Sequence, residues 1–219
     1  MASERQTRIV IVDDHAVVRV GMTQLLERED GLVVCGEART AAEAEELVER
    51  ERPDLMIVDL SLEGGSGLEL IKTIRERHPS ILMLVCSMHD ELLFAERVLA
   101  AGARGYVMKA EAADLLVQAV RKVRSGGVYV SPAMSDRLLQ TMADGYRPAD
   151  GAPEERLSDR QLEVFQMIGR GLGTREIAEQ LGLSVKTIET HRQEIKRRLG
   201  LETNLELVRR AVQWFLESS

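Results

Sequence analysis

Short apolar runs alternate with amphipathic stretches along the first 125 residues. Five of the apolar runs have the length of strands, and the first four are rich in Val, Ile or Leu without polar alternation; they lie at 8–12, 32–37, 54–58, 81–86 and 105–108. Helical spacing of apolar residues predicts five helices, at 15–28, 41–51, 67–78, 92–101 and 112–124. Unbroken apolar strands between amphipathic helices are typical of a parallel sheet that is covered on both faces. The pattern therefore predicts a five-stranded, doubly wound parallel α/β domain over 1–125.

The pattern changes after the glycine pair at 126–127. A helix is predicted at 131–143, and the stretch that follows it combines Gly, Pro and charged residues. We interpret 126–156 as a linker, partly helical and partly flexible. From there on the strand signals stop, and four short helical patterns separated by glycine-containing turns predict a small all-α domain over 157–219.

Composition is that of a folded globular protein, with 44% hydrophobic and 30% charged residues. No stretch approaches the roughly 18 consecutive apolar residues of a membrane span, and the N-terminus is polar, unlike a signal peptide. We therefore expect a cytoplasmic protein that does not contact a membrane. Cys35 and Cys86 lie in apolar strands, which favours reduced core thiols over a disulfide.

The net charge of -7 is distributed unevenly. Residues 154–219 carry 11 basic and 11 acidic side chains, whereas the preceding part carries 18 basic and 25 acidic ones. Within 184–200, five basic residues stand against two acidic ones. An acidic protein can still present a cationic surface of this kind to nucleic acid.

Polar side chains stand at the ends of four predicted strands. Asp13 and Asp14 follow the first strand, Asp59 the third, Ser87 the fourth and Lys109 the fifth. Because the carboxyl ends of parallel strands meet at one edge of a sheet, we expect these five side chains to converge. Three close carboxylates repel one another unless a divalent cation with hard oxygen ligands, such as Mg²⁺, binds between them. A lysine and a hydroxyl beside that cation suit a phosphoryl group.

Four segments carry these residues: Val12-Asp13-Asp14-His15, Val58-Asp59-Leu60, Ser87-Met88-His89 and Gly105-Tyr106-Val107-Met108-Lys109. Together they resemble the receiver domain of response regulators, a flavodoxin-like fold, over about 125 residues. The resemblance implies that Asp59 accepts a phosphoryl group from a histidine kinase. It also implies that Mg²⁺ is ligated by Asp14, Asp59 and the backbone carbonyl of Ser61, with Asp13 contributing through water.

The remaining roles also follow from the resemblance. Lys109 would pair with the phosphoryl oxygens, Ser87 would shift to hydrogen-bond them, and Tyr106 would turn inward behind Ser87. In one respect the chain departs from the family pattern, because Glu63 stands at the position where a proline is common and two glycines follow it. This difference predicts a more mobile loop beside Asp59, with an effect on kinase choice or phosphate lifetime.

The histidines near the pocket carry no assigned catalytic role. His15 and His89 can be ordinary loop residues, and His78, which precedes a proline, is expected to be a solvated helix end. His89 lies two residues after the fourth strand's serine, so we hypothesise that it shapes the access of water to the phosphoryl group.

Capping signals predict the helices of the second domain. Ser158 and Gln161 form a capping box, and Thr174 and Ser184 are expected to cap the next two helices. Between those two helices Gly182 supplies the left-handed residue that a sharp stop requires. Two helices joined by this short turn, the second of them cationic, predict a helix-turn-helix whose second helix enters the major groove.

The third helix of this domain has a polar face that can reach a DNA groove and its phosphates. Its members are Lys186, Thr187, Glu189, Thr190, Arg192, Gln193, Lys196 and Arg197. With the segments at 157–164 and 174–178, this helix resembles the LuxR-type helix-turn-helix, over about 157–215. The resemblance implies that the phosphates are held by Lys186, Thr187 and Arg192, and that Glu189, Thr190 and Gln193 face bases. His191 can either contact DNA or pack against the neighbouring helix.

The fourth helix is expected to contribute mainly to the core, through Leu205, Val208, Ala211, Val212 and Phe215. In the LuxR-type family this helix also supplies a dimer surface. Trp214 can lie either at that surface or in the core.

The two resemblances together predict a response regulator of the NarL/FixJ type. Phosphorylation of Asp59 would control binding to double-stranded promoter DNA, with a homodimer favoured when the protein is phosphorylated. No enzymatic activity is expected beyond catalysis of its own phosphorylation and dephosphorylation. One alternative is a Mg²⁺-dependent phosphohydrolase, which requires an acidic residue where Ser61 stands. Another is a DNA-binding protein whose receiver works without phosphorylation, which the complete set of pocket residues disfavours.

Overall fold

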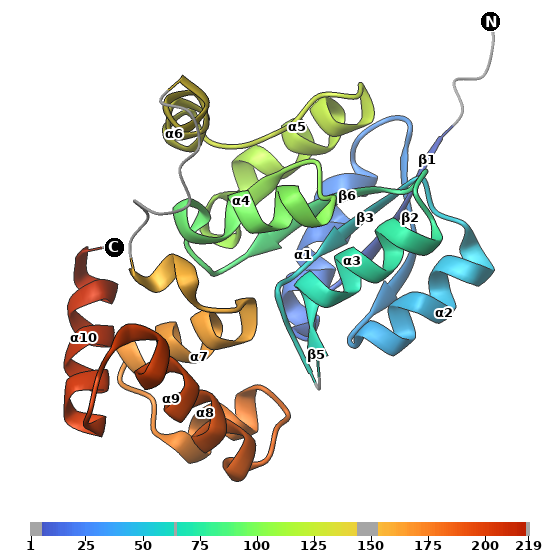
Figure 1. Ribbon diagram of the computed structural model, residues 1–219. Coiled ribbons are helices and arrows are strands. Elements are labelled where there is room, and N and C mark those ends of the chain that lie inside the picture. The colour runs from blue at the N-terminus through green and yellow to red at the C-terminus, as the bar shows by residue number, and fades with distance from the viewer. Residues whose placement is uncertain (1–5, 64, 144–152, 218–219) are drawn as a thin grey trace, which may run out of the picture. The chain divides into compact units, whose positions relative to one another are not determined.

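The computed structural model describes residues 6–63, 65–143 and 153–217 (Figure 1). The chain divides into two compact units, one ending at Gln140 and the other beginning at Thr141. The main strands of the first unit are β1 (Thr7–Val12), β2 (Leu32–Ala38), β3 (Leu55–Val58), β6 (Leu82–Ser87) and β7 (Tyr106–Met108). The helices that follow them are α1 (Ala16–Glu27), α2 (Ala41–Glu51), α3 (Gly67–Arg77), α4 (Glu91–Ala101) and α5 (Ala112–Arg124).

All five main strands are parallel and form one sheet in the order β2-β1-β3-β6-β7. Figure 1 shows α1 and α5 on one face of this sheet and α2, α3 and α4 on the other. Alternate strand residues such as Ile9, Ile11 and Ile57 belong to a buried cluster with Leu26 of α1 and Val120 of α5. Burial of both faces explains the unbroken apolar strands, and the predicted doubly wound fold is confirmed.

The loop after β3 contains a feature that the sequence did not indicate. Two short strands, β4 (Ser61–Leu62) and β5 (Gly65–Ser66), pair antiparallel there. Leu62 is buried, and Glu63 pairs with Arg39 at 2.8 Å on the surface. This loop, predicted to be mobile, is thus held by a backbone ladder, an apolar side chain and an exposed ion pair.

The first part of the predicted linker packs against the first unit. Tyr129 forms an isolated parallel bridge with Gly105, beside the edge strand β7. The predicted helix is present as α6 (Pro132–Ala143), and its Met134 is fully buried. The flexible portion predicted after this helix falls largely at 144–152, outside the described residues.

The second unit is helical in the part that the structure describes. Its elements are a 3₁₀ turn η2 (Pro153–Arg156) and the helices α7 (Asp159–Gly169), α8 (Thr174–Gln180), α9 (Val185–Leu199) and α10 (Asn204–Glu217). Ser158 caps α7 in the predicted capping box, Ser184 caps α9, and Gly182 has a φ of 61°. The prediction for Thr174 is wrong, because this residue is the first of α8 and Gly173 is its N-cap. Glu176 Oε2 accepts a hydrogen bond from the Gly173 amide at 2.7 Å, which replaces a side-chain cap.

The core face of α10 also differs from the prediction. Leu205 is 77% exposed and Val208 is exposed as well, whereas Leu207, Ala211 and Trp214 are buried. Both stripes have helical spacing, but only the second includes the indole, whose ring centroid lies 5.3 Å from that of a phenylalanine of α7. Burial of this large side chain sets the rotation of the helix.

Two further observations complete the description. Cys35 and Cys86 are free thiols, as expected. Cys86 is fully buried, whereas Cys35 is only partly buried, so the prediction of a core position is wrong for Cys35. None of the helices in the described ranges has the length and apolar character needed to span a bilayer.

Candidate functional site

Lys109 joins two carboxylates at the carboxyl edge of the sheet. Its Nζ lies 2.7 Å from Oδ2 of Asp13 and 2.6 Å from Oδ2 of Asp59. The three side chains come from the ends of β1, β3 and β7 and are nearly buried, with Asp59 only 3% exposed. Burial alone lowers the pKa of Lys109, but the charges of Asp59 and Asp13 outweigh this effect and raise the pKa above its ordinary value. The raised pKa favours the charged ammonium form of Lys109 between the two carboxylates.

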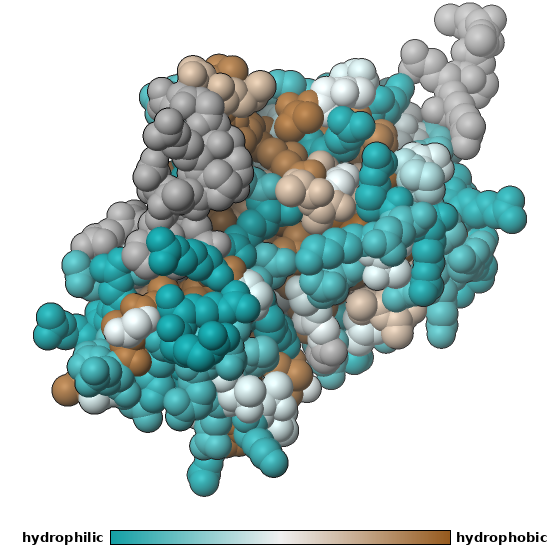
Figure 2. All heavy atoms as spheres, viewed as in Figure 1, coloured by the Kyte–Doolittle hydropathy of each residue, from teal (hydrophilic) through white to brown (hydrophobic). Residues whose placement is uncertain are grey.

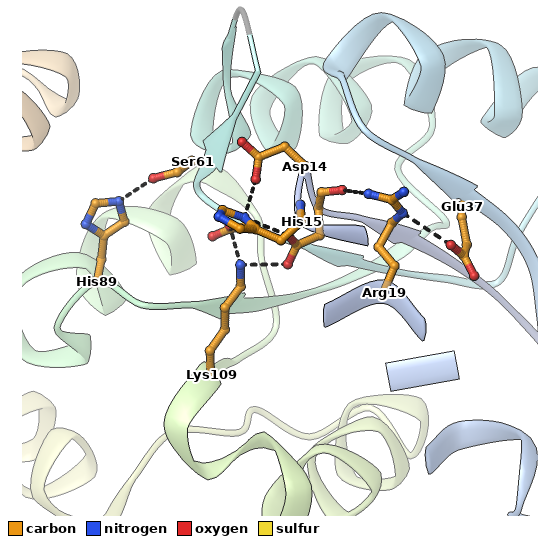
Figure 3. A network of polar contacts seen from close by, with 9 residues as sticks. Asp14, His15, Arg19, Glu37, Ser61, His89 and Lys109 are labelled. Carbon is orange, nitrogen blue, oxygen red and sulfur yellow. Dashed lines mark hydrogen bonds and ion pairs between the residues drawn. The ribbon is translucent and has the colours of Figure 1, made fainter. Parts of the chain in front are cut away.

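Asp14 and His15, which lie between β1 and α1, join this cluster. His15 Nδ1 lies 2.5 Å from Oδ1 of Asp14, and the His15 amide donates to Oδ1 of Asp13 at 2.9 Å (Figure 3). Potential ligand atoms of Asp13, Asp14, His15 and Asp59 all lie within 4.8 Å of one another. His15, which was expected to be an ordinary loop residue, therefore extends the predicted acidic cluster.

The donor set fits a hard divalent cation. Oδ1 of Asp59 is buried and accepts no hydrogen bond from the described residues, although the other oxygen of this carboxylate is bound to Lys109. A buried carboxylate oxygen without a donor is costly unless a cation or an ordered water satisfies it. Oxygen ligands contributed by closely spaced carboxylates are those that Mg²⁺ prefers.

Ser87 and Tyr106, the two residues predicted to move on phosphorylation, lie beside this cluster on β6 and β7. Ser87 and Tyr106 are both buried, and the Tyr106 hydroxyl donates to the backbone carbonyl of His89 at 2.8 Å. Burial raises the pKa of Tyr106 well above its ordinary value, so the phenol stays protonated. The His89 ring is buried too, and its Nε2 lies 2.8 Å from the hydroxyl of Ser61 (Figure 3). This hydrogen bond connects the loop after β3 to the loop after β6.

The loop after Asp59 depends on a glycine. A Cβ atom at Gly67 would lie 1.9 Å from the backbone oxygen of Asp59. The Gly67 amide also donates to the carbonyl of Leu60 at 2.9 Å. This close approach requires a residue without a side chain, and it places the start of α3 against the backbone of Asp59.

The second candidate site is the polar face of α9. Lys186, Glu189, Thr190, Gln193 and Arg197 are exposed. Thr187, Arg192 and Lys196 are partly exposed. Figure 2 shows a mainly hydrophilic surface over α8 and α9. The predicted set therefore lies on an accessible surface, while the face with Ile188 and Ile195 is buried.

Two members of this helix have features that the spacing did not reveal. Arg197 pairs with Glu194 at 2.6 Å, one turn away on the same helix. His191 is half-buried, and desolvation together with the nearby charge of Arg160 lowers its pKa. The His191 ring is therefore expected to be neutral and to pack partly against the second unit.

A sheet with this acidic edge, followed by a helix-turn-helix, defines a class of protein. Residues 9–121 match the family of response regulator receiver domains, and residues 155–211 match the LuxR family of bacterial regulatory proteins. The chain belongs to the response regulators that combine a receiver domain with a LuxR-type DNA-binding domain.

Relatives match nearly the whole chain. The oxygen regulatory protein NreC of Staphylococcus carnosus is 37% identical over 210 residues, which cover 94% of this chain and 97% of the relative. The response regulator RcsB of Salmonella typhimurium has a solved structure with a TM-score of 0.68 and 26% identity, covering 95% of this chain and 98% of that one. RcsB bound to the rprA promoter with the phosphomimetic BeF₃⁻ matches with a TM-score of 0.63 and 27% identity, covering 94% and 98% of the two chains.

Proposed function

We propose that Asp59 is the phosphoacceptor of this response regulator and that its phosphorylation controls promoter binding by the helix-turn-helix. The observation that carries the proposal is the state of the Asp59 carboxylate, in which one oxygen is bound to Lys109 and the other accepts no hydrogen bond from the described residues. One carboxylate oxygen of Asp59 attacks phosphorus, an oxygen–phosphorus bond forms, and the phosphohistidine of a histidine kinase loses its phosphorus–nitrogen bond. No enzymatic activity is proposed beyond this reaction and its hydrolytic reversal.

The other pocket residues act through position and charge. We assign the ligation of Mg²⁺ to Asp14, Asp59 and the carbonyl of Ser61, with Asp13 acting through water. The ion, when bound, neutralises the oxygens of the transferring phosphoryl group. Lys109 is already within hydrogen-bond distance of Asp59 and would pair with the new phosphoryl oxygens.

Ser87 and Tyr106 report the phosphorylation to the surface. The Ser87 hydroxyl is buried at the end of β6, and the backbone amide of His89 approaches it at 3.4 Å. Movement of this hydroxyl toward the phosphoryl group would disturb the segment that also receives the Tyr106 hydrogen bond. A two-state receiver of this kind can favour one DNA-binding form of the protein over another.

The DNA-binding form that we propose is a homodimer on paired half-sites. Two RcsB dimers have been solved bound to two parallel DNAs, which supports the dimeric form proposed here. In the present chain Leu205, Val208 and Leu216 leave an apolar surface on α10. The exposed residues of α9 would enter the major groove, and their positive charges would hold phosphates.

The test uses the full-length protein with Mg²⁺ and acetyl phosphate, in wild-type and Asp59→Asn forms. We expect a mass increase of one phosphoryl group, a shift toward dimer and tighter binding to promoter DNA, all absent from the variant. A wild-type protein that takes up no phosphoryl group would refute the assignment of Asp59. Steady turnover of phosphate esters would instead favour the phosphohydrolase.

A further inference from the structure

Arg19 approaches the acidic pocket from outside it (Figure 3). Its Nη1 donates to the backbone carbonyl of Asp13 at 2.6 Å, and its Nε lies 3.2 Å from Oε2 of Glu37. The arginine side chain is only 11% exposed. A guanidinium group that is anchored through two of its nitrogens loses its rotational freedom, so it holds the carbonyl in a fixed direction.

Glu37, the partner of Arg19, is also held in place by a second side chain of α1. Thr23, one turn further along α1 than Arg19, donates from its hydroxyl to Oε1 of Glu37 at 2.9 Å. Both oxygens of the glutamate are thus bound to side chains of α1, while its backbone belongs to β2. These contacts form a bracket between α1 and β2, and the Arg19 guanidinium is its link to the pocket.

The carbonyl that Arg19 binds lies in the peptide group between Asp13 and Asp14. On the other side of Asp13, its amide donates to the carbonyl of Ala38 at 3.0 Å. The first aspartate is therefore fixed by β2 on one side and by Arg19 on the other, and the direction of this peptide group determines where the Asp14 carboxylate points. Arg19 makes this contact without occupying any carboxylate oxygen of the pocket, whereas Lys109 occupies two.

We propose that Arg19, held by Glu37, is a positioning residue that sets the affinity of the acidic pocket for its divalent cation. The inference deepens the proposed function and rests on it. Groups that orient metal ligands without touching the metal typically change its affinity about 10- to 100-fold when they are removed. The cation affinity of this pocket should therefore depend on an arginine that contacts none of its ligand oxygens.

The experiment measures binding of Mn²⁺ alone to the full-length protein by isothermal titration calorimetry. We expect Arg19→Gln to weaken binding about tenfold and Arg19→Lys, which keeps the charge and one donor, to recover part of the loss. Glu37→Gln should also weaken binding, because the guanidinium loses its charged anchor. The matched control is Arg77→Gln, which removes an arginine that pairs with Glu45 at 2.9 Å on α2 and should leave the affinity unchanged.

A second measurement separates positioning from general damage. The rate of phosphorylation by acetyl phosphate is followed as a function of Mg²⁺ concentration. Arg19→Gln should need about tenfold more Mg²⁺ for half its maximal rate and should approach the wild-type rate at saturation. Damage to the fold would lower the rate at every Mg²⁺ concentration, and that result would overturn the proposal.

The outcomes distinguish this proposal from the proposed function. Wild-type and Arg19→Gln proteins with equal Mn²⁺ affinity would overturn the role of Arg19, even if Asp59 is phosphorylated normally. A wild-type protein that binds Mn²⁺ but takes up no phosphoryl group would overturn the proposed function instead. If Arg19→Gln does not fold, Glu37→Gln decides, and wild-type affinity in that variant would overturn the proposal.

Discussion

Replacement of Gly67 by alanine adds a single methyl group against the backbone of Asp59, the proposed phosphoacceptor. The new Cβ would lie 1.9 Å from the backbone oxygen of Asp59, 2.8 Å from its carbonyl carbon and 2.9 Å from the Cα of Leu60. An unstrained contact between carbon and oxygen is about 3.3 Å, so the two backbones must separate by about 1.4 Å. Neither can move freely, because Gly67 donates to Leu60 and Leu68 is buried at the start of α3.

This displacement has two expected consequences of known size. Overpacking of a well-packed site costs about 1–3 kcal/mol, so we expect the free energy of unfolding to fall by about 2 kcal/mol. A reacting group displaced by about 1 Å can lose about 100-fold in rate, and we expect a loss of this order in phosphorylation by acetyl phosphate. Gly67→Ala should therefore remain folded but react slowly.

The two effects are measured by urea unfolding, followed by far-ultraviolet circular dichroism, and by mass spectrometry of the phosphorylated protein. The matched control is Gly65→Ala in the same loop, whose Cβ would meet only the Cβ of Ala41, at 3.8 Å. It should be close to wild type in both assays. A Gly67→Ala protein with wild-type stability and rate would refute the inferred backbone clash.

Two further predictions concern the phosphoryl lifetime and DNA binding. His89→Ala removes the hydrogen bond to Ser61, so we expect water to enter more easily and the half-life of phosphorylated Asp59 to shorten; an unchanged half-life by mass spectrometry would contradict the predicted role of this histidine. Lys186→Ala should weaken binding to all duplexes and reduce the salt dependence by about one unit, whereas Gln193→Ala should change sequence preference by about 1–3 kcal/mol. Fluorescence anisotropy with promoter and random duplexes measures both, and equal losses on every duplex for both variants would mean that α9 is wrongly placed.

The fold was predictable wherever a long periodic pattern exists. The strands and helices of the first unit end within about two residues of their predicted positions, because each combines apolar spacing with a turn signal. The β4–β5 ladder has two residues in each strand, too few for any period to be visible. The N-cap of α8 was placed wrongly for a related reason. Gly173 has no side chain that could identify it as an N-cap, and its amide donates instead to the side chain of Glu176, three residues away.

The aspartates and the lysine of the candidate site were predictable, but the side chains that support them were not. Strand ends are visible in a sequence, which is why Asp13, Asp59 and Lys109 could be grouped before the structure was known. The contacts of Arg19 were not visible, because one partner is a backbone carbonyl and the other a glutamate 18 residues away. The spacing of polar residues along an amphipathic helix does not show whether a given side chain faces solvent or turns back toward a loop.

The charges of the pocket explain why phosphorylation should change its contacts. Three carboxylates face one ammonium group, so a bound divalent cation would supply the balance of positive charge that the protein lacks there. Phosphorylation of Asp59 replaces a singly charged carboxylate with a group of greater negative charge and more acceptor oxygens. Lys109, which in the present structure divides its contacts between Asp13 and Asp59, should then turn toward the phosphoryl oxygens. Asp13 would lose a partner while its backbone stays fixed by Arg19, so the rearrangement should pass to the Ser87 side of the pocket.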